Sequence, residues 1–277
     1  MKTLKVLIAL LVFLIGANFL AAKKVRKAQF VPYQKIYAHE LCKNSDFRCV
    51  VVQKNISWEK FWSDKTEREL IMKLNRQNGK LLKSQMTVAI PKNMAGKVLM
   101  DFSPFPKKIQ YTPQMPLPGA DPRHTFEYKE IVREKFVVFD PALLAWGAYD
   151  KDGNLIRWGP ALGGQDYCRD THRACRTVTG IFRVGLKGNV NSRSGAYPIG
   201  CGSKRKPCAP MPWIMYFHKH LYGIHGSTQM IGYNASHGCV RTFIDDAEWL
   251  NKNFVDLGTM VIVKSYPHSL KKWKSKK

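Results

Sequence analysis

Acidic side chains are scarce in this sequence, in which 20 Asp and Glu residues stand against 45 Lys and Arg residues over 277 positions. The formal net charge of +25 predicts anionic partners. A recognisable nucleic-acid-binding motif is also missing, which argues against nucleic acid and favours anionic polymers of a cell envelope. The basic tail, residues 267–277, is either a solvated segment or a contact for an acidic surface.

Long apolar runs are missing after residue 22, so we expect no later segment to span a bilayer. Residues 1–22 have the pattern of a signal peptide, with Lys2 and Lys5 before an apolar stretch and small residues at its end. The alternative is an uncleaved anchor, because Val6–Ala22 reaches the lower limit for a membrane span. We therefore expect export to a periplasm or cell envelope. A lipid-modified N-terminal cysteine is not expected, because the first cysteine is Cys42.

The seven cysteines form a regular pattern with one left over. Six fall into pairs with six residues between the partners, and this spacing favours the disulfides Cys42–Cys49, Cys168–Cys175 and Cys201–Cys208 among fifteen possible pairings. A zinc site at Cys168, His172 and Cys175 is the alternative for one pair, but its spacing is unlike common zinc modules and export favours the disulfide. The unpaired Cys239 is either an intermolecular bridge or a reactive thiol.

Cys239 lies in the segment Ser236-His237-Gly238-Cys239-Val240-Arg241, which follows a His225-Gly226 pair. A thiol nucleophile needs a base because a free cysteine is mostly protonated at neutral pH, and His225 and His237 are the candidates. Gly238 allows the backbone to approach a substrate carbonyl closely. The plainer interpretation is a structural cysteine with two histidines on a turn.

Two further segments, Thr179-Gly180-Ile181-Phe182 and Met211-Pro212-Trp213, precede this motif. Together with it they resemble the L,D-transpeptidase catalytic domain of the YkuD type over residues 132–266. Two features depart from the family: Arg241 stands where many members have Asn, and the loop from His225 to Ser236 is short.

The resemblance implies that Cys239 attacks the amide between the third residue of a peptidoglycan stem, an L-centre, and D-alanine. A thioester acyl-enzyme forms, and an amine of another stem or of an envelope protein resolves it. His225 would act as general base and then acid, while backbone N–H groups around His237 and Gly238, including that of Cys239, would form the oxyanion hole. The resemblance also implies covalent inhibition by carbapenem-type β-lactams and requires no metal or organic cofactor.

Four other residues near the motif are candidates for substrate binding. Arg241 would either hold a stem-peptide carboxylate or form a structural salt bridge with Asp245 or Asp246. Ser236 would fix the turn by a local hydrogen bond. Tyr233 and Trp213 would line the cleft or belong to the core.

The fold class expected for residues 132–266 is mainly β, because short strands alternate with turns from Glu134 onward. We expect a mostly antiparallel β-sandwich or barrel with one helix after the motif, started by a capping box of Thr242 and Asp245. Residues 42–95 resemble a small α+β LysM module, which would bind glycan or cap the catalytic domain. Residues 96–131 are a proline-rich connector.

Two other classes of function compete with the transpeptidase. One is a peptidoglycan-binding protein that has lost catalysis, motivated by the basic charge and the LysM-like segment. The other is a secreted cysteine peptidase or amidase, which shares the nucleophile but needs a cleft for ordinary L-peptides.

Overall fold

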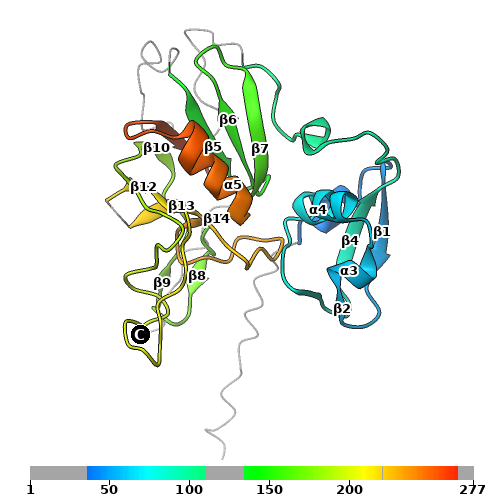
Figure 1. Cartoon of the computed structure of the whole chain (residues 1–277), viewed down its shortest axis with the longest axis horizontal. Coiled ribbons are helices and arrows are strands. Elements are labelled where there is room, and N and C mark those ends of the chain that lie inside the picture. The colour runs from blue at the N-terminus through cyan, green and yellow to red at the C-terminus, as the bar shows by residue number, and fades with distance from the viewer. Residues whose placement is uncertain (1–35, 110–133, 220, 268–277) are drawn as a thin grey trace, which may run out of the picture. The chain divides into compact units, whose positions relative to one another are not determined.

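The computed structural model describes residues 36–109, 134–219 and 221–267 (Figure 1). The predicted signal peptide, most of the proline-rich connector and almost all of the basic tail lie outside the described residues. Within them, no helix has the length and apolar character needed to cross a membrane. The described residues fall into one compact unit.

Residues 36–109, called the N-terminal module from here on, contain short helices and two small antiparallel sheets. Strands β1 (Phe47–Val51) and β4 (Thr87–Pro91) form one sheet, and β2 (Ile56–Ser57) and β3 (Leu81–Leu82) form the other. The helices are α2 (Ala38–Leu41), α3 (Trp58–Phe61), α4 (Lys65–Leu74) and the 3-10 turn η2 (Leu99–Phe102). The expected order of strand, two helices and strand is present, while the likeness to a LysM module stays a prediction.

Helix α4 connects this module to the rest of the protein. It starts at Asp64, whose carboxylate accepts a hydrogen bond from the Glu67 N–H at 2.8 Å, as an N-cap residue does. Its apolar residues Leu70 and Leu74 are buried together with side chains of the large sheet, including Phe136, Tyr149 and Trp158. The module therefore shares a hydrophobic core with the domain that follows it.

That domain contains a nine-stranded sheet in the order β10-β15-β5-β6-β7-β14-β13-β12-β11. The strands are, in chain order, β5 (Phe136–Asp140), β6 (Ala145–Tyr149), β7 (Leu155–Leu162), β10 (Gly180–Arg183), β11 (Leu186–Lys187), β12 (Met215–His218), β13 (Tyr222–Gly226), β14 (Val240–Thr242) and β15 (Met260–Val263). Strands β5, β6 and β7 run side by side as antiparallel neighbours (Figure 1). The hairpin β8 (Tyr167–Cys168) and β9 (Arg173–Ala174) stands apart.

The sheet confirms the mainly β fold expected from the sequence. Every residue of β5, β6 and β15 is buried, which suits β-branched and aromatic side chains covered on both faces. One core joins side chains from distant strands, such as Phe139, Phe217 and Val240, so the sheet curls around it. Two neighbouring pairs are parallel, β5 with β15 and β13 with β14. The second of these pairs carries the motif.

The expected helix follows the motif as α5 (Ile244–Trp249) and continues into a π-helical turn, η4 (Leu250–Phe254). Its predicted capping box is wrong. Phe243 occupies the N-cap position and makes no side-chain cap. Thr242 lies in β14, where its hydroxyl donates to the Pro160 carbonyl at 2.7 Å and accepts from the Trp146 indole N–H at 2.9 Å. The hydroxyl is therefore committed to the sheet.

Candidate active site

Parallel pairing of β13 with β14 brings the two halves of the motif together. His225 is the register partner of Arg241, and Cys239 comes two residues before Arg241. Register partners in neighbouring strands have side chains on the same face of the sheet, and Cys239, in the bend just before β14, lies there with His225 and Arg241. They line the same cleft, whose volume is about 730 Å³. Three residues that lie within 16 positions of one another in the sequence thus line one site.

The imidazole of His225 is buried and held by its own strand. Its Nδ1 lies 2.9 Å from the Gly226 carbonyl oxygen. Because a carbonyl oxygen can only accept, Nδ1 carries the proton and Nε2 keeps a free lone pair in the neutral ring. Burial lowers the pKa of His225 to about 4, the Gly226 carbonyl opposes this shift, and Arg241 adds to it. At neutral pH the ring is therefore uncharged, and its Nε2 can accept a proton.

Cys239 is half-buried and is the free cysteine among the described residues. Burial raises the pKa of its thiol, while a hydrogen bond from the Gly223 backbone and the charge of Arg241 oppose this shift. Its Sγ lies 3.7 Å from the Leu221 carbonyl oxygen. The resting site therefore holds a neutral thiol and a neutral imidazole.

The other six cysteines form the three disulfides expected from their spacing, Cys42–Cys49, Cys168–Cys175 and Cys201–Cys208. Cys168, Asp170 and His237 bring three potential ligand atoms within 4.8 Å of one another. The Cys168 sulfur is bonded to Cys175, which removes the thiolate that a zinc site would need. The disulfide thus decides between the two interpretations of this segment.

Ser236 organises the turn that carries Cys239. Its hydroxyl donates to the Cys239 carbonyl at 2.5 Å and accepts from the Gly238 N–H at 3.1 Å. Gly238 has φ +133°, and a Cβ at this position would lie 2.8 Å from the Tyr222 ring. Only glycine fits here. The Gly238 N–H is engaged by Ser236, so the oxyanion hole expected around His237 and Gly238 must draw on other N–H groups.

His237 lies at the rim of the cleft and is bound to a neighbouring loop. Its Nε2 lies 2.7 Å from Asp170 Oδ2, and its ring centroid is 4.3 Å from that of Tyr197. The hydrogen bond from His237 lowers the pKa of Asp170 below its usual value. Asp170 sits within the loop closed by the Cys168–Cys175 disulfide. The two histidines of the motif therefore have different surroundings.

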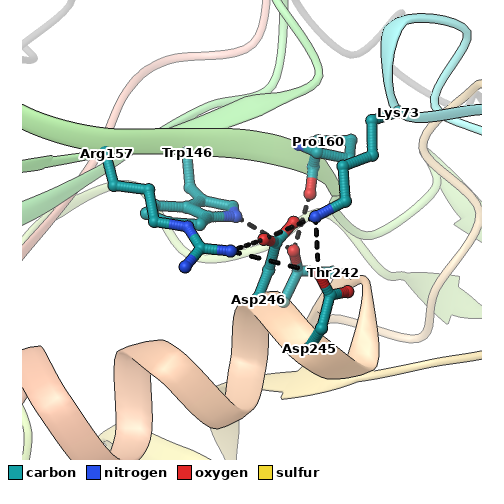
Figure 2. Close-up of polar contacts among 7 residues, drawn as sticks. All are labelled: Lys73, Trp146, Arg157, Pro160, Thr242, Asp245 and Asp246. Carbon is teal, nitrogen blue, oxygen red and sulfur yellow. Dashed lines mark hydrogen bonds and ion pairs between the residues drawn. The ribbon is translucent and has the colours of Figure 1, made fainter. Parts of the chain in front are cut away.

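Of the two alternatives for Arg241, the salt bridge with Asp245 or Asp246 does not form among the described residues. Figure 2 shows that Lys73 and Arg157 converge on Asp246, with Lys73 Nζ at 2.9 Å and Arg157 Nη2 at 2.7 Å from its Oδ1. Lys73 also lies 2.6 Å from Asp245. Burial would lower the pKa of Lys73, but these carboxylates raise it above its ordinary value. In the part of the chain that the structure describes, Arg241 has no ion-pair partner.

Two aromatic candidates do not reach the cleft. Trp213 and Tyr233 are not among the residues that line it, and the Trp213 ring lies 4.5 Å from Lys252 Nζ instead. The aromatic lining comes from Tyr197, Tyr216 and Tyr222.

The cleft also contains residues that the sequence did not single out. Arg173 lines it and donates from Nη2 to the Tyr197 hydroxyl at 2.8 Å. Both residues come from loops adjoining disulfides, the first inside the Cys168–Cys175 loop and the second shortly before Cys201. No local pattern signals them, because only the tertiary structure places these loops beside Cys239. The paired cysteines indicate that these two loops are held in place, but not that they lie beside Cys239.

Part of the chain is similar to known proteins. A family model for the L,D-transpeptidase catalytic domain, YkuD, matches residues 134–263. Among solved structures, the chain is similar to an L,D-transpeptidase from Xylanimonas cellulosilytica DSM 15894, with 26% identity and a TM-score of 0.40 over 47% of this chain and 60% of that one. An L,D-transpeptidase from Mycobacterium smegmatis shares 22% identity, with a TM-score of 0.38 over 48% and 59%.

L,D-transpeptidase 3 from Mycobacterium tuberculosis, solved in complex with a faropenem-derived adduct, shares 19% identity, with a TM-score of 0.38 over 47% of this chain and 60% of that one. The chain thus spans about 60% of the length of these structures. No curated protein sequence matches it. Residues 134–263, which contain the motif, thus match the L,D-transpeptidase catalytic domain family, YkuD.

Proposed function

We propose that the protein is an exported L,D-transpeptidase in which Cys239 is the nucleophile. The observation that carries this proposal is the free thiol of Cys239 in one cleft with His225, whose Nδ1 is committed to the Gly226 carbonyl. That commitment leaves Nε2 as the base for the thiol proton. Three disulfides support folding in an oxidising compartment outside the cytoplasm.

The proposed donor is a tetrapeptide stem of peptidoglycan. As the Cys239 sulfur bonds to the carbonyl carbon of the L-centred third residue, its proton passes to His225. The C–N bond to D-alanine then breaks, and His225 returns the proton to the leaving amine, so that a thioester and free D-alanine result. An amine acceptor from another stem or an envelope protein then attacks the thioester carbonyl carbon and gives a proton to His225. The C–S bond breaks, and the proton returns to the sulfur of Cys239. Water in place of the amine would give a carboxypeptidase.

Two other residues have roles in this proposal. The backbone N–H of Cys239 stabilises the oxyanion, because Ser236 engages that of Gly238. Arg241 lines the cleft without an ion-pair partner among the described residues, and its forked guanidinium suits a stem-peptide carboxylate.

The test is to incubate the purified protein with a carbapenem and with a disaccharide-tetrapeptide, and to measure intact masses and released D-alanine. We expect one covalent adduct on a protein whose mass shows three disulfides, and release of D-alanine from the tetrapeptide. Both should be lost in Cys239→Ala, while Cys42→Ser/Cys49→Ser, which removes sulfurs that do not line the cleft, keeps the adduct. An adduct that survives Cys239→Ala, or an inert wild-type thiol, would reject the proposal. Cleavage of ordinary L-peptides would favour the cysteine peptidase.

A further inference from the structure

The loop between the two halves of the motif forms a wall of the cleft. It runs from Ser227 to Ala235 and connects strand β13, which carries His225, to the turn before Cys239. Its residues Ser227, Thr228 and Gln229 line the cleft. The conformation of this loop therefore affects both the shape of the cleft and the approach of a ligand to the sulfur.

The N-terminal module contacts this loop through backbone hydrogen bonds. The segment after α4 pairs with it in the antiparallel sense at Gln77 and Ile231. The Gly232 N–H donates to the Arg76 carbonyl at 2.9 Å, and the Asn78 N–H donates to the Met230 carbonyl at 3.1 Å. These contacts form a short ladder between two segments about 150 positions apart in the sequence.

The side chain of Asn78 binds the same loop at two further points. Its Nδ2 donates to the Ser227 carbonyl at 2.6 Å, and its Oδ1 accepts from the Met230 N–H at 2.8 Å. The two partners fix the orientation of the amide, since a carbonyl can only accept and an N–H can only donate. One side chain thus spans the loop from the part that lines the cleft to the part that is buried, because Met230 is 1% exposed.

The segment that carries Asn78 is itself anchored to the nine-stranded sheet. The buried guanidinium of Arg76 donates to the Leu144 carbonyl at 3.1 Å and to the Leu143 carbonyl at 3.2 Å. One turn earlier, Lys73 binds Asp246 at the start of α5 (Figure 2). The end of α4 is thus held at the connection between β5 and β6 and at the helix after the motif, so Asn78 approaches the loop from a rigid position.

From these contacts we propose that Asn78 is a positioning residue for the Cys239 site. The N-terminal module holds the Ser227–Ala235 loop in the conformation that admits an acyl donor to the cleft. The module then serves catalysis as a structural part of the enzyme, in addition to any contact with glycan. The proposal rests on the proposed function, because its rate measurement needs an acylated Cys239.

The test compares Asn78→Ala with Asn55→Ala. Asn55 is a matched control, because its side-chain amide also accepts a hydrogen bond from a backbone N–H, that of Ser84 at 2.9 Å, but far from the loop. The measurements are the rate constant of acylation by a carbapenem, the amide hydrogen exchange of residues 227–232 and the midpoint of unfolding. We expect Asn78→Ala to slow acylation about tenfold, which corresponds to about 1.4 kcal/mol of activation free energy.

The amides of Met230 and Gly232 should exchange about tenfold faster in Asn78→Ala than in the wild type. In Asn55→Ala, the acylation rate and the exchange of these amides should stay unchanged. Asn78→Asp is a second variant of the same shape. It keeps the acceptor for Met230 but places a carboxylate oxygen against the Ser227 carbonyl, so it should also slow acylation about tenfold. If Asn78→Ala fails to fold, Asn78→Asp provides the test.

Acylation at the wild-type rate by folded Asn78→Ala or Asn78→Asp, or unchanged exchange in the loop, would overturn the positioning role. If the wild-type protein itself forms no adduct, the proposed function fails. Amide hydrogen exchange of residues 227–232 then tests by itself whether Asn78 holds the loop, and unchanged exchange in Asn78→Ala would overturn this role.

Discussion

Two arginines within the described structure have opposite surroundings. Arg76 is 1% exposed and donates to the carbonyl oxygens of Lys73, Leu74, Leu143 and Leu144, with its guanidinium 4.0 Å from the centre of the Tyr37 ring. Arg241 lines the cleft beside Cys239, and no hydrogen bond or ion pair satisfies its guanidinium among the described residues. The first is a structural residue, and the second is free to meet a ligand.

Burial lowers the pKa of both guanidinium groups, that of Arg76 to about 10 with Tyr37 opposing the shift, and that of Arg241 with the Cys239 thiol opposing it. Both stay charged at neutral pH. The difference therefore lies in hydrogen bonding alone. A buried cation with satisfied donors stabilises the fold, whereas one that keeps its donors free at a cleft retains capacity for an anionic substrate.

The largest effect should come from exchanging both arginines for methionine in separate variants. Arg76→Met leaves several buried carbonyl oxygens without donors, and we expect the free energy of unfolding to fall by about 3 kcal/mol. Arg241→Met breaks no hydrogen bond of the described fold and should change it by less than about 0.5 kcal/mol.

Urea unfolding of both variants measures this contrast, with the acylation rate as the second readout. Acylation of Arg241→Met should slow, because its cation opposes the raised pKa of the Cys239 thiol. Equal losses of stability in the two variants would show that the comparison between these residues is wrong.

The second prediction concerns the pH range in which His225 acts as a base. Its pKa of about 4 means that the folded protein keeps the ring neutral well below the ordinary value of 6.5. Between pH 7 and pH 5.5 the acylation rate should change by less than about twofold, whereas an imidazole of ordinary pKa would lose about eightfold. The pH profile of carbapenem acylation measures this directly, and a steep fall centred near pH 6.5 would contradict it.

The same shift has a consequence for stability. Because the lowered pKa of His225 favours the neutral form in the folded state, its contribution is fully present above pH 6.5. It is lost as the pH falls from 6.5 towards 4, since the unfolded chain then takes up a proton that the folded one excludes. His225→Gln is the control, and its unfolding free energy should lack this component of the pH dependence.

Local patterns explain why much of the site could be predicted from sequence. The spacing of the cysteines predicted all three disulfides, and the motif brought Cys239 and His225 to one cleft. Trp213 was misplaced because proximity to the motif says nothing about the direction of a side chain, and this residue has a positive φ of 60° in a turn.

Contacts between distant segments could not be predicted. Asn78 and the loop it binds are separated by 149 to 152 positions, and no periodicity links them. The partners of Asp246 show the same limit, because Lys73 and Arg157 reach it from a different helix and from strand β7. From the sequence, a salt bridge of Asp246 with Arg241 was one of two open alternatives, and Arg241 lies at the cleft instead.

The smallest effect should come from the rim of the cleft, where His237 and Asp170 form an exposed pair, in contrast to the buried hydrogen bonds of Arg76. The side chains of His237 and Asp170 are 27% and 48% exposed, and such pairs contribute at most about 1 kcal/mol. Asp170→Asn keeps a hydrogen-bonding group beside His237 but removes the charge, so acylation should slow by only about two- to fivefold. Asp166→Asn is the matched control, because that carboxylate pairs with Arg176, 2.8 Å away, and neither residue lines the cleft. Acylation rates at low and high salt measure the effect, which should shrink as salt screens the wild-type pair. A loss greater than about a hundredfold in Asp170→Asn would mean that the rim pair takes part in the proton transfers themselves, and that His225 does not act alone.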